Sequence, residues 1–147
     1  MKGLVIYGST TNNTRQVVAR LPKQLSFPVD VFEASTIQNV NLLDQYDLLI
    51  FLASTWGDAE LQVDMENFFV RHSISLNGKP FAICELGNYY GYDDFDFGAL
   101  RIMEHYLQEW GGRELIEPFS MDSLPRKDWL NLARWCELLN RNATELQ

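Results

Sequence analysis

At 147 residues, with 46% hydrophobic and 22% charged residues, the sequence predicts one folded domain over residues 1–147 and excludes a disordered chain. A net charge of −8 argues against nucleic acid as a partner, and no run reaches the roughly 18–20 apolar residues that cross a membrane. Residues 1–3 lead into an apolar run without a signal-peptide pattern. Cys84 and Cys136 show no metal or redox spacing, so we expect buried thiols in a cytoplasmic protein.

Strand and helix patterns alternate along the chain. Apolar or alternating runs predict strands over residues 2–7, 28–34, 47–53, 81–86 and 114–119. Helical spacing predicts helices over residues 14–25, 63–72, 97–110 and 124–139, with one or two helical turns over 37–43. Pro22 is expected to kink the first helix or end it early, because proline removes one hydrogen bond and crowds the previous turn.

This alternation predicts an α/β fold in which helices cover both faces of a doubly wound, five-stranded parallel sheet. The second and fifth strands are the least apolar, which places them at the two edges of the order 2-1-3-4-5. Ligands of such sheets bind outside the carboxyl ends of the strands. The candidate site is therefore formed by the loops over residues 8–14, 54–61 and 87–95.

The first of these loops joins a strand to a helix through hydroxyl and amide residues, Ser9 to Thr14. Backbone N–H groups at a helix N-terminus bind anions, and the helix dipole favours negative charge there. No lysine follows the turn, and the spacing of a nucleoside-triphosphate loop is absent. Taken alone, the turn is better explained as a well-capped start of a helix.

The other two loops are aromatic. Trp56 lies outside any apolar period and beside Gly57, and three tyrosines lie between residues 89 and 92. A large aromatic side chain at this edge suits stacking on a planar ligand. The alternative is a surface loop that contacts another protein. Together with the first turn, the two loops favour a ligand site.

Three motifs carry a family resemblance. Residues 9–14 match S/T-x-T-G-x-T except that Asn12 replaces the glycine, residues 55–62 are close to T-W-G-x-G-E-L-Q, and residues 87–99 are similar to G-D-x-x-G-Y-x-D-N-F. Through these motifs the chain resembles the flavodoxins, which are small FMN-binding electron carriers. The resemblance covers essentially the whole chain. The resemblance implies a flavodoxin-like fold of the short form, because the chain passes quickly from residues 114–116 to its last helix.

The resemblance also implies which residues bind FMN. The hydroxyl and amide turn would hold the phosphate, Trp56 would cover the inner face of the flavin, and Tyr92 would cover the outer face, with Tyr89 or Tyr90 as alternatives. The carbonyl of the Gly57–Asp58 peptide would accept a hydrogen bond from N5–H of the semiquinone. The implied cofactor-binding set is Ser9, Thr10, Thr11, Asn12, Asn13, Thr14, Ser54, Thr55, Trp56, Gly57, Asp58, Leu86, Gly87, Asn88, Tyr89, Tyr92, Asp94 and Phe95.

Two residues depart from the family pattern. Asn12 stands at a glycine position that can require positive φ, which asparagine tolerates better than most residues. Asn88 stands near the pyrimidine edge where the family usually has aspartate, which removes a negative charge.

The implied function is low-potential, one-electron transfer between a reductase and acceptor proteins, with FMN cycling between semiquinone and hydroquinone and no catalytic residue. Residues 24–100 carry twelve acidic and two basic side chains, which serve solubility or steer partners with basic docking surfaces to a monomeric carrier. The first alternative is a flavodoxin-like FMN reductase that acts on quinones or similar small acceptors. The second is a flavin-free interaction domain on the same fold. The phospho-receiver version of the fold is set aside, because it needs acids where the first and third strands end in Tyr7-Gly8 and Ala53-Ser54.

Overall fold

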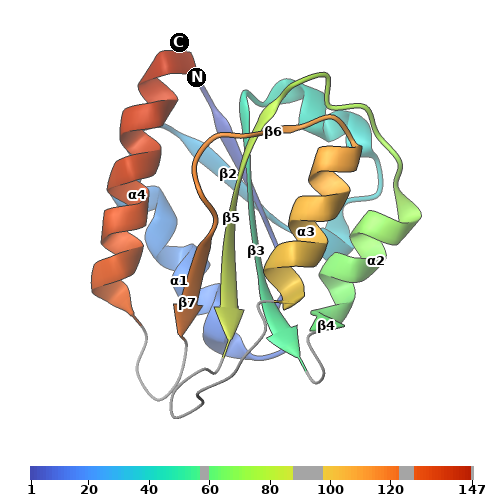
Figure 1. Ribbon diagram of the computed structural model, residues 1–147, viewed down its shortest axis with the longest axis horizontal. Helices are drawn as coiled ribbons and strands as arrows, with labels where there is room; N and C mark the ends of the chain where they lie inside the picture. The colour runs from blue at the N-terminus through green and yellow to red at the C-terminus, as the bar shows by residue number, and fades with distance from the viewer. Residues whose placement is uncertain (57–59, 88–97, 123–127, 147) are drawn as a thin grey trace.

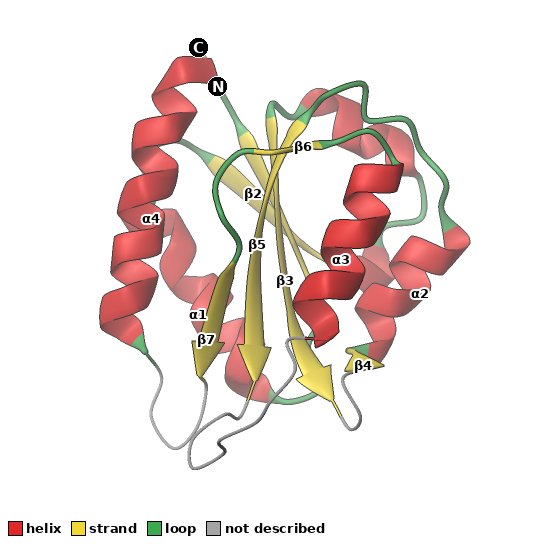
Figure 2. Cartoon of the chain, in the orientation of Figure 1, coloured by secondary structure: helices red, strands yellow, loops and turns green. Residues whose placement is uncertain are grey.

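The computed structural model describes residues 1–56, 60–87, 98–122 and 128–146. A single twisted sheet runs through the centre, and helices cover both of its faces (Figures 1 and 2). None of the helices within these ranges is both long and apolar enough to cross a membrane. The predicted α/β architecture is confirmed.

The strands of the sheet follow the predicted order. The sheet path is β2-β1-β3-β5-β6, and every neighbouring pair along it is parallel. The central strands are buried on both faces, as their unbroken apolar runs predict. The bounds are β1 Gly3–Tyr7, β2 Val29–Glu33, β3 Leu48–Trp56, β4 Glu60–Leu61, β5 Pro80–Gly87, β6 Arg113–Glu114 and β7 Phe119–Asp122.

The sheet separates the core into two layers, each covered by two helices. Helices α2 and α3 pack on one face, around Phe51 and Phe69, while α1 and α4 pack on the other, around Val5 and Trp135. The bounds are α1 Asn12–Gln24, α2 Val63–Arg71, α3 Gly98–Glu109 and α4 Trp129–Ala143, with short 3-10 turns η1 Ala34–Thr36, η2 Val40–Gln45 and η3 Thr144–Leu146.

The predicted fifth strand over residues 114–119 is wrong in its bounds. It is two short strands, β6 and β7, which both pair in parallel with β5. Between them Ile116 turns into the core under α1 and α4, and Pro118 has no N–H to donate to a neighbouring strand. The chain therefore stops pairing with β5 after β6 and pairs with it again at β7.

Two helices also differ from prediction. α1 continues through Pro22 and ends at Gln24, with the N–H of Leu25 donating to the carbonyl of Leu21. Pro22 is exposed, so the loss of one hydrogen bond does not end the helix there. α4 begins at Trp129 after its N-cap Asp128 and extends past residue 139 to Ala143. The predicted start at residue 124 lies outside the described residues.

Candidate functional site

The carboxyl ends of the strands bring the predicted site residues together at one edge of the sheet. The arrowheads of β3, β5 and β7 point to this edge, which lies opposite the chain termini (Figure 1). Tyr7 pairs in register with Leu52, and Ser54 pairs with Leu86, so the segments over residues 8–14, 54–56 and 86–87 lie at the same level. The remaining predicted residues, Gly57, Asp58, Asn88, Tyr89, Tyr92, Asp94 and Phe95, lie outside the described residues.

The turn after β1 presents a helix N-terminus that the side chain of its own cap residue does not satisfy. Thr11 is the N-cap of α1, and its side chain makes no capping hydrogen bond. The first turn of α1 carries no acidic residue, and the hydroxyl of Ser9 donates to the carbonyl of Thr11 rather than capping the helix. The N–H groups that open a helix normally need such a partner. An anion at this turn would supply it.

The N-terminus of α2, nearby at the same edge, is satisfied in the usual way. Gln62 is the N-cap, and its Oε1 accepts a hydrogen bond from the Met65 N–H at 3.0 Å. Asp64 and Glu66 add negative charge to the first turn of α2, where the helix dipole favours it. Unlike α2, α1 thus leaves the N–H groups of its first turn to an external partner.

Asn12 departs from the family pattern without needing the backbone of a glycine. Among the described residues other than glycine, positive φ occurs at Asn77 (φ 51°) and not at Asn12, which is the first residue of α1. The turn therefore needs no glycine conformation at this position, and the asparagine is accommodated without backbone strain.

Gln62 joins the three segments of the edge. It is 1% exposed, its N–H donates to the Ser54 carbonyl at 3.0 Å, and its Nε2 donates to the Thr10 Oγ1 at 3.1 Å. The Met65 N–H requires an oxygen acceptor, which fixes the orientation of the side-chain amide. Gln62 thus holds the turn after β1 against the end of β3 and the start of α2.

Gly8 leaves the space that the Gln62 side chain occupies. A Cβ at residue 8 would overlap the Oε1 of Gln62 and lie 3.2 Å from the Met65 nitrogen. The N–H of Gly8 donates to the Leu52 carbonyl at 3.1 Å, so the backbone cannot move away without losing this bond. Gly8 is therefore needed for close packing at the start of the turn.

Trp56 ends β3, and this corrects a prediction. The sequence predicts a loop over residues 54–56, but these residues continue β3, and Thr55 and Trp56 pair in antiparallel fashion with β4. The indole is 41% exposed, and its Nε1–H donates to the Ser54 hydroxyl at 2.6 Å. A rigid strand thus presents a half-exposed aromatic ring in a fixed orientation.

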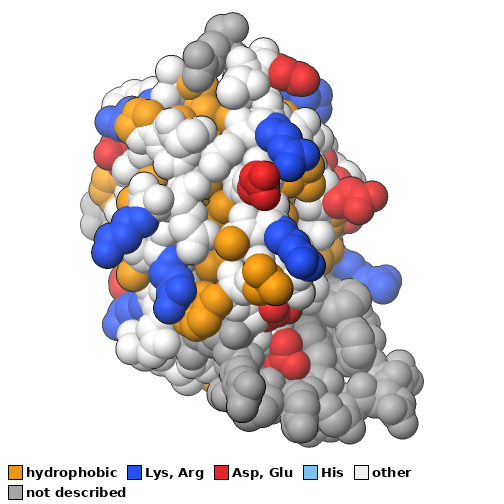
Figure 3. Space-filling view, turned by 90° about the vertical axis from the view of Figure 1, so that its left-hand side faces the viewer, with side chains coloured by type: hydrophobic (Ala, Val, Ile, Leu, Met, Phe, Trp, Pro, Cys, Tyr) orange, Lys and Arg blue, Asp and Glu red, His pale blue; other side chains and the backbone are white. Residues whose placement is uncertain are grey.

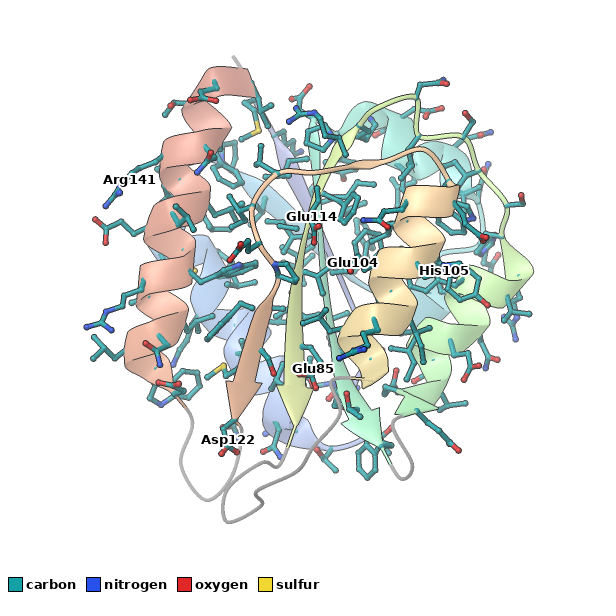
Figure 4. All side chains as sticks on the ribbon, viewed as in Figure 1. Glu85, Glu104, His105, Glu114, Asp122 and Arg141 are labelled. Carbon is teal, nitrogen blue, oxygen red and sulfur yellow. The ribbon has the colours of Figure 1, made fainter. Side chains whose placement is uncertain are left out.

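Glu85 is a buried carboxyl group that the sequence-based prediction of the site does not include. It lies two residues before the end of β5 and is 0% exposed. The Thr55 hydroxyl donates to its Oε2 at 2.7 Å, and the Ser120 hydroxyl donates to its Oε1 at 2.6 Å. Figure 4 shows Glu85 near the carboxyl ends of the strands. The sequence does contain a pattern that could have identified this residue, because an acid interrupts the apolar run over residues 81–86.

Gln62 belongs to one of the family motifs, but the sequence assigns it no role. The sequence shows only a polar residue just before a helix, which is compatible with an N-cap. Its contact with Thr10 depends on two loops that are 52 residues apart meeting at one edge.

The first cation after the turn is engaged by an acid. Arg15 lies in α1, and its guanidinium forms a 2.6 Å ion pair with Glu33 at the end of β2. The Tyr7 hydroxyl also donates to Glu33, and burial together with this carboxylate raises the pKa of Tyr7. Backbone and hydroxyl donors, rather than a free cation, are therefore what the turn offers to an anion.

No group of three or more His, Cys, Asp or Glu residues within the described ranges is arranged to hold a metal ion. Cys84 and Cys136 are free and buried, as predicted. Burial, followed by the negative charge of Glu85, raises the pKa of Cys84 well above its usual value, and burial raises the pKa of Cys136 to about 11. Neither thiol is poised as a nucleophile.

A second group of carboxyl groups lies away from this edge. The pKa of Glu114 is raised to about 7, first by burial and then by a hydrogen bond with Glu104 and the negative charges of Glu104 and Glu117. Oε1 of Glu114 is buried without a hydrogen-bond partner, which also favours the neutral acid. Figure 4 shows Glu104 on α3 and Glu114 on β6.

This group predicts a pH dependence of stability. A carboxyl group whose pKa is raised by folding stabilises the protein below its unfolded pKa, and that stabilisation is lost as the pH rises through about 7. Glu114→Gln is therefore expected to raise the free energy of unfolding above that pH by about 1 kcal/mol, a value reduced for solvent screening. Denaturant titrations across this range measure it. Glu137→Gln on the exposed side of α4 is the control, and equal pH profiles for wild type and Glu114→Gln would reject the assignment.

Comparisons with known proteins agree with this fold. The sequence profile of the flavodoxin family matches residues 5–134. A flavodoxin of Maridesulfovibrio salexigens is 26% identical over 86% of this chain and 90% of its own length. A flavodoxin of Synechocystis sp. is 32% identical over 74% of this chain and 65% of its own length. The flavodoxin of Fusobacterium nucleatum bound to flavin mononucleotide superposes with a TM-score of 0.71 at 17% identity, covering 99% of this chain and 96% of that chain. The chain therefore belongs to the flavodoxin family, whose members carry electrons on FMN.

Proposed function

We propose that this protein holds FMN at the carboxyl edge of its sheet, within a single domain over residues 1–147, and passes single electrons from a reductase to acceptor proteins. The observation that carries the proposal is the N-terminus of α1. The side chain of its cap residue makes no capping hydrogen bond and its first turn has no acid, whereas α2 at the same edge has a side-chain cap and two acids in its first turn. An FMN phosphate matches the donors that α1 leaves open.

The residues of the turn would share the phosphate. The N–H groups at the start of α1 and the exposed side chains of Thr10 and Thr11 supply donors, and Ser9, Asn12, Asn13 and Thr14 complete the predicted set. Gln62 and Gly8 would hold the turn at the correct distance from α2, since Gly8 begins the turn and the Gln62 side chain packs against it and Thr10.

Trp56 would cover one face of the flavin. Its ring is half-exposed at the edge, and the hydrogen bond from its Nε1 to Ser54 fixes the indole before any ligand arrives. Leu86 and Gly87 end β5 beside the end of β3, and we propose that their backbone contacts the flavin ring. Predicted contacts of Asn88, Tyr89, Tyr92, Asp94 and Phe95 remain part of the proposal.

Bound FMN supplies the one-electron chemistry, and the chain supplies the surrounding charge. Glu60 and Asp64 lie beside the end of β3, and Asp122 ends β7. Negative side chains close to a cofactor disfavour additional negative charge on it. They would make the carrier a stronger donor in its fully reduced form.

We propose that partners with basic docking surfaces approach this edge. The opposite charge gathers on the face formed by α1 and α4, over which Lys and Arg side chains are spread (Figure 3). Exposed cations of these two helices include Lys23 on α1 and Arg134 and Arg141 on α4. A basic partner is therefore steered away from that face and towards the acidic edge.

We also propose that the carrier is a monomer in the cytoplasm. Its two buried free thiols suit a reducing compartment.

The experiment that tests this function compares FMN with riboflavin, which lacks the phosphate. Apoprotein is expected to bind FMN at least tenfold more tightly, because only FMN satisfies the N-terminus of α1; one decade corresponds to about 1.4 kcal/mol. Quenching of flavin fluorescence measures both affinities. Equal affinities for FMN and riboflavin would show that the turn does not bind the phosphate. If the protein bound neither flavin, the proposed function would be rejected.

A further inference from the structure

The buried carboxyl group of Glu85 has no part in holding FMN as proposed above, yet it lies close to where the flavin would sit. It is 0% exposed, and its neighbours along β5 are Cys84 and Leu86, which are both buried. Burying a carboxyl group is costly unless it is hydrogen-bonded. A group kept in such a place therefore calls for a physical account.

The hydrogen bonds around Glu85 indicate an ionised carboxylate. Thr55 Oγ1 accepts the Ala99 N–H at 3.0 Å, so the hydroxyl proton of Thr55 is directed to Glu85 Oε2. Ser120 donates to the other oxygen at 2.6 Å. Separations of 2.6–2.7 Å lie in the range of O–H···O⁻ bonds. Both carboxyl oxygens thus act as acceptors, as an ionised group requires.

The start of α3 adds to this stabilisation. Ala99 is the second residue of α3, and its N–H points to the Thr55 hydroxyl that binds Glu85. The positive end of the helix dipole is thereby linked to the carboxylate through one hydroxyl group. Strands β3, β5 and β7 and helix α3 all converge on the same buried charge.

We propose that Glu85 is a buried anion that lowers the potential at which bound FMN takes up its second electron. The inference rests on the proposed binding of FMN at this edge. Thr55 lies next to Trp56, and Glu85 is two residues from Gly87, so the carboxylate lies close to the strand ends that would contact the flavin. A second electron from a reductase adds one negative charge at the site when no proton follows it. A charge in a low-dielectric interior opposes this addition far more than an exposed one does.

The variant Glu85→Gln tests the charge while keeping the shape of the side chain. Both one-electron potentials of the FMN-loaded protein are measured by spectroelectrochemical titration. The more negative potential is expected to rise by about 59 mV, which is a tenfold change in the one-electron equilibrium. Glu137→Gln removes the same formal charge from a side chain of α4 that is 65% exposed, and it is expected to leave both potentials unchanged.

The outcomes separate a role in redox tuning from a structural one. Lower melting temperature and weaker FMN binding with unchanged potentials would make Glu85 a structural residue only and overturn the proposal. Failure of the wild-type protein to bind FMN would instead reject the proposed function.

If Glu85→Gln does not fold, the proposal can still be tested on the wild-type holoprotein. Carbon-13 NMR of glutamate δ-carbons, assigned through the backbone, reads the ionisation state of Glu85 directly. A resonance typical of a carboxylate at neutral pH supports the proposal, and one typical of a protonated acid overturns it.

Discussion

Gly8→Ala is expected to lower the free energy of unfolding by about 2–3 kcal/mol, because an overpacked contact and a lost helix cap act together. The new Cβ would overlap Gln62 Oε1 and lie 3.2 Å from the Met65 nitrogen. The amide of Gln62 must then move, and it would give up its hydrogen bonds to Met65 and Thr10. FMN affinity should fall roughly tenfold, since the turn loses its support against α2.

The matched control is Gly78→Ala. Gly78 has φ +80°, and a Cβ added there would meet nothing within 4 Å, so this substitution strains the backbone without touching a neighbour. It should cost about 1 kcal/mol of stability and leave FMN affinity unchanged. Chemical denaturation and flavin titration of both variants provide the comparison. Equal affinity losses in the two variants would show that the effect at Gly8 is not specific to the turn.

Trp56→Ala is expected to weaken FMN binding by about 1–3 kcal/mol, the usual range for a planar base stacked on an aromatic side chain. The indole is 41% exposed, so its removal leaves no large cavity and the fold should be little affected. The loss of affinity and a nearly unchanged melting temperature together are the signature of a ligand-stacking residue. Flavin fluorescence titration and thermal unfolding measure the two quantities.

Trp56→Phe serves as the control for stacking. It keeps an aromatic face but loses the Nε1–H that donates to the Ser54 hydroxyl, so its affinity should lie between wild type and Trp56→Ala. Leu130→Ala, at an exposed position of α4, controls for loss of surface apolar area and should bind FMN normally. Wild-type affinity in Trp56→Ala would place the flavin elsewhere.

The central strands could be predicted from the sequence because their physical cause is local. Residues 48–53 and 81–84 are apolar without interruption, and strands buried on both faces need such runs. The edge position of β2 followed equally from its alternation with acids. Once the parallel order was set, it placed the candidate site at the carboxyl edge.

The segments that differ from prediction depend on contacts that the local sequence pattern does not show. Ser54 extends β3 by pairing with Leu86 of β5, and Thr55 and Trp56 extend it by pairing with β4. The break between β6 and β7 depends on Ile116 entering a core formed by α1 and α4. Neither contact leaves a periodic pattern in the chain.

The two residues of the site that sequence reasoning missed differ in kind. Glu85 could have been found, since a charged residue within a buried strand always needs a partner. Gln62 could not, because its role exists only when residues 10, 54 and 65 surround it. The identity of the cofactor likewise came from resemblance, and the geometry of the α1 N-terminus now gives it a physical basis.

The most direct test of one-electron transfer is a reductive titration of the FMN-loaded protein, followed by its visible spectrum. We expect a yellow protein that takes up two electrons in separate steps, with a blue, long-wavelength band that rises and then falls as the second electron enters. Direct passage from the oxidised to the fully reduced spectrum, with no such band at any stage, would contradict a one-electron carrier.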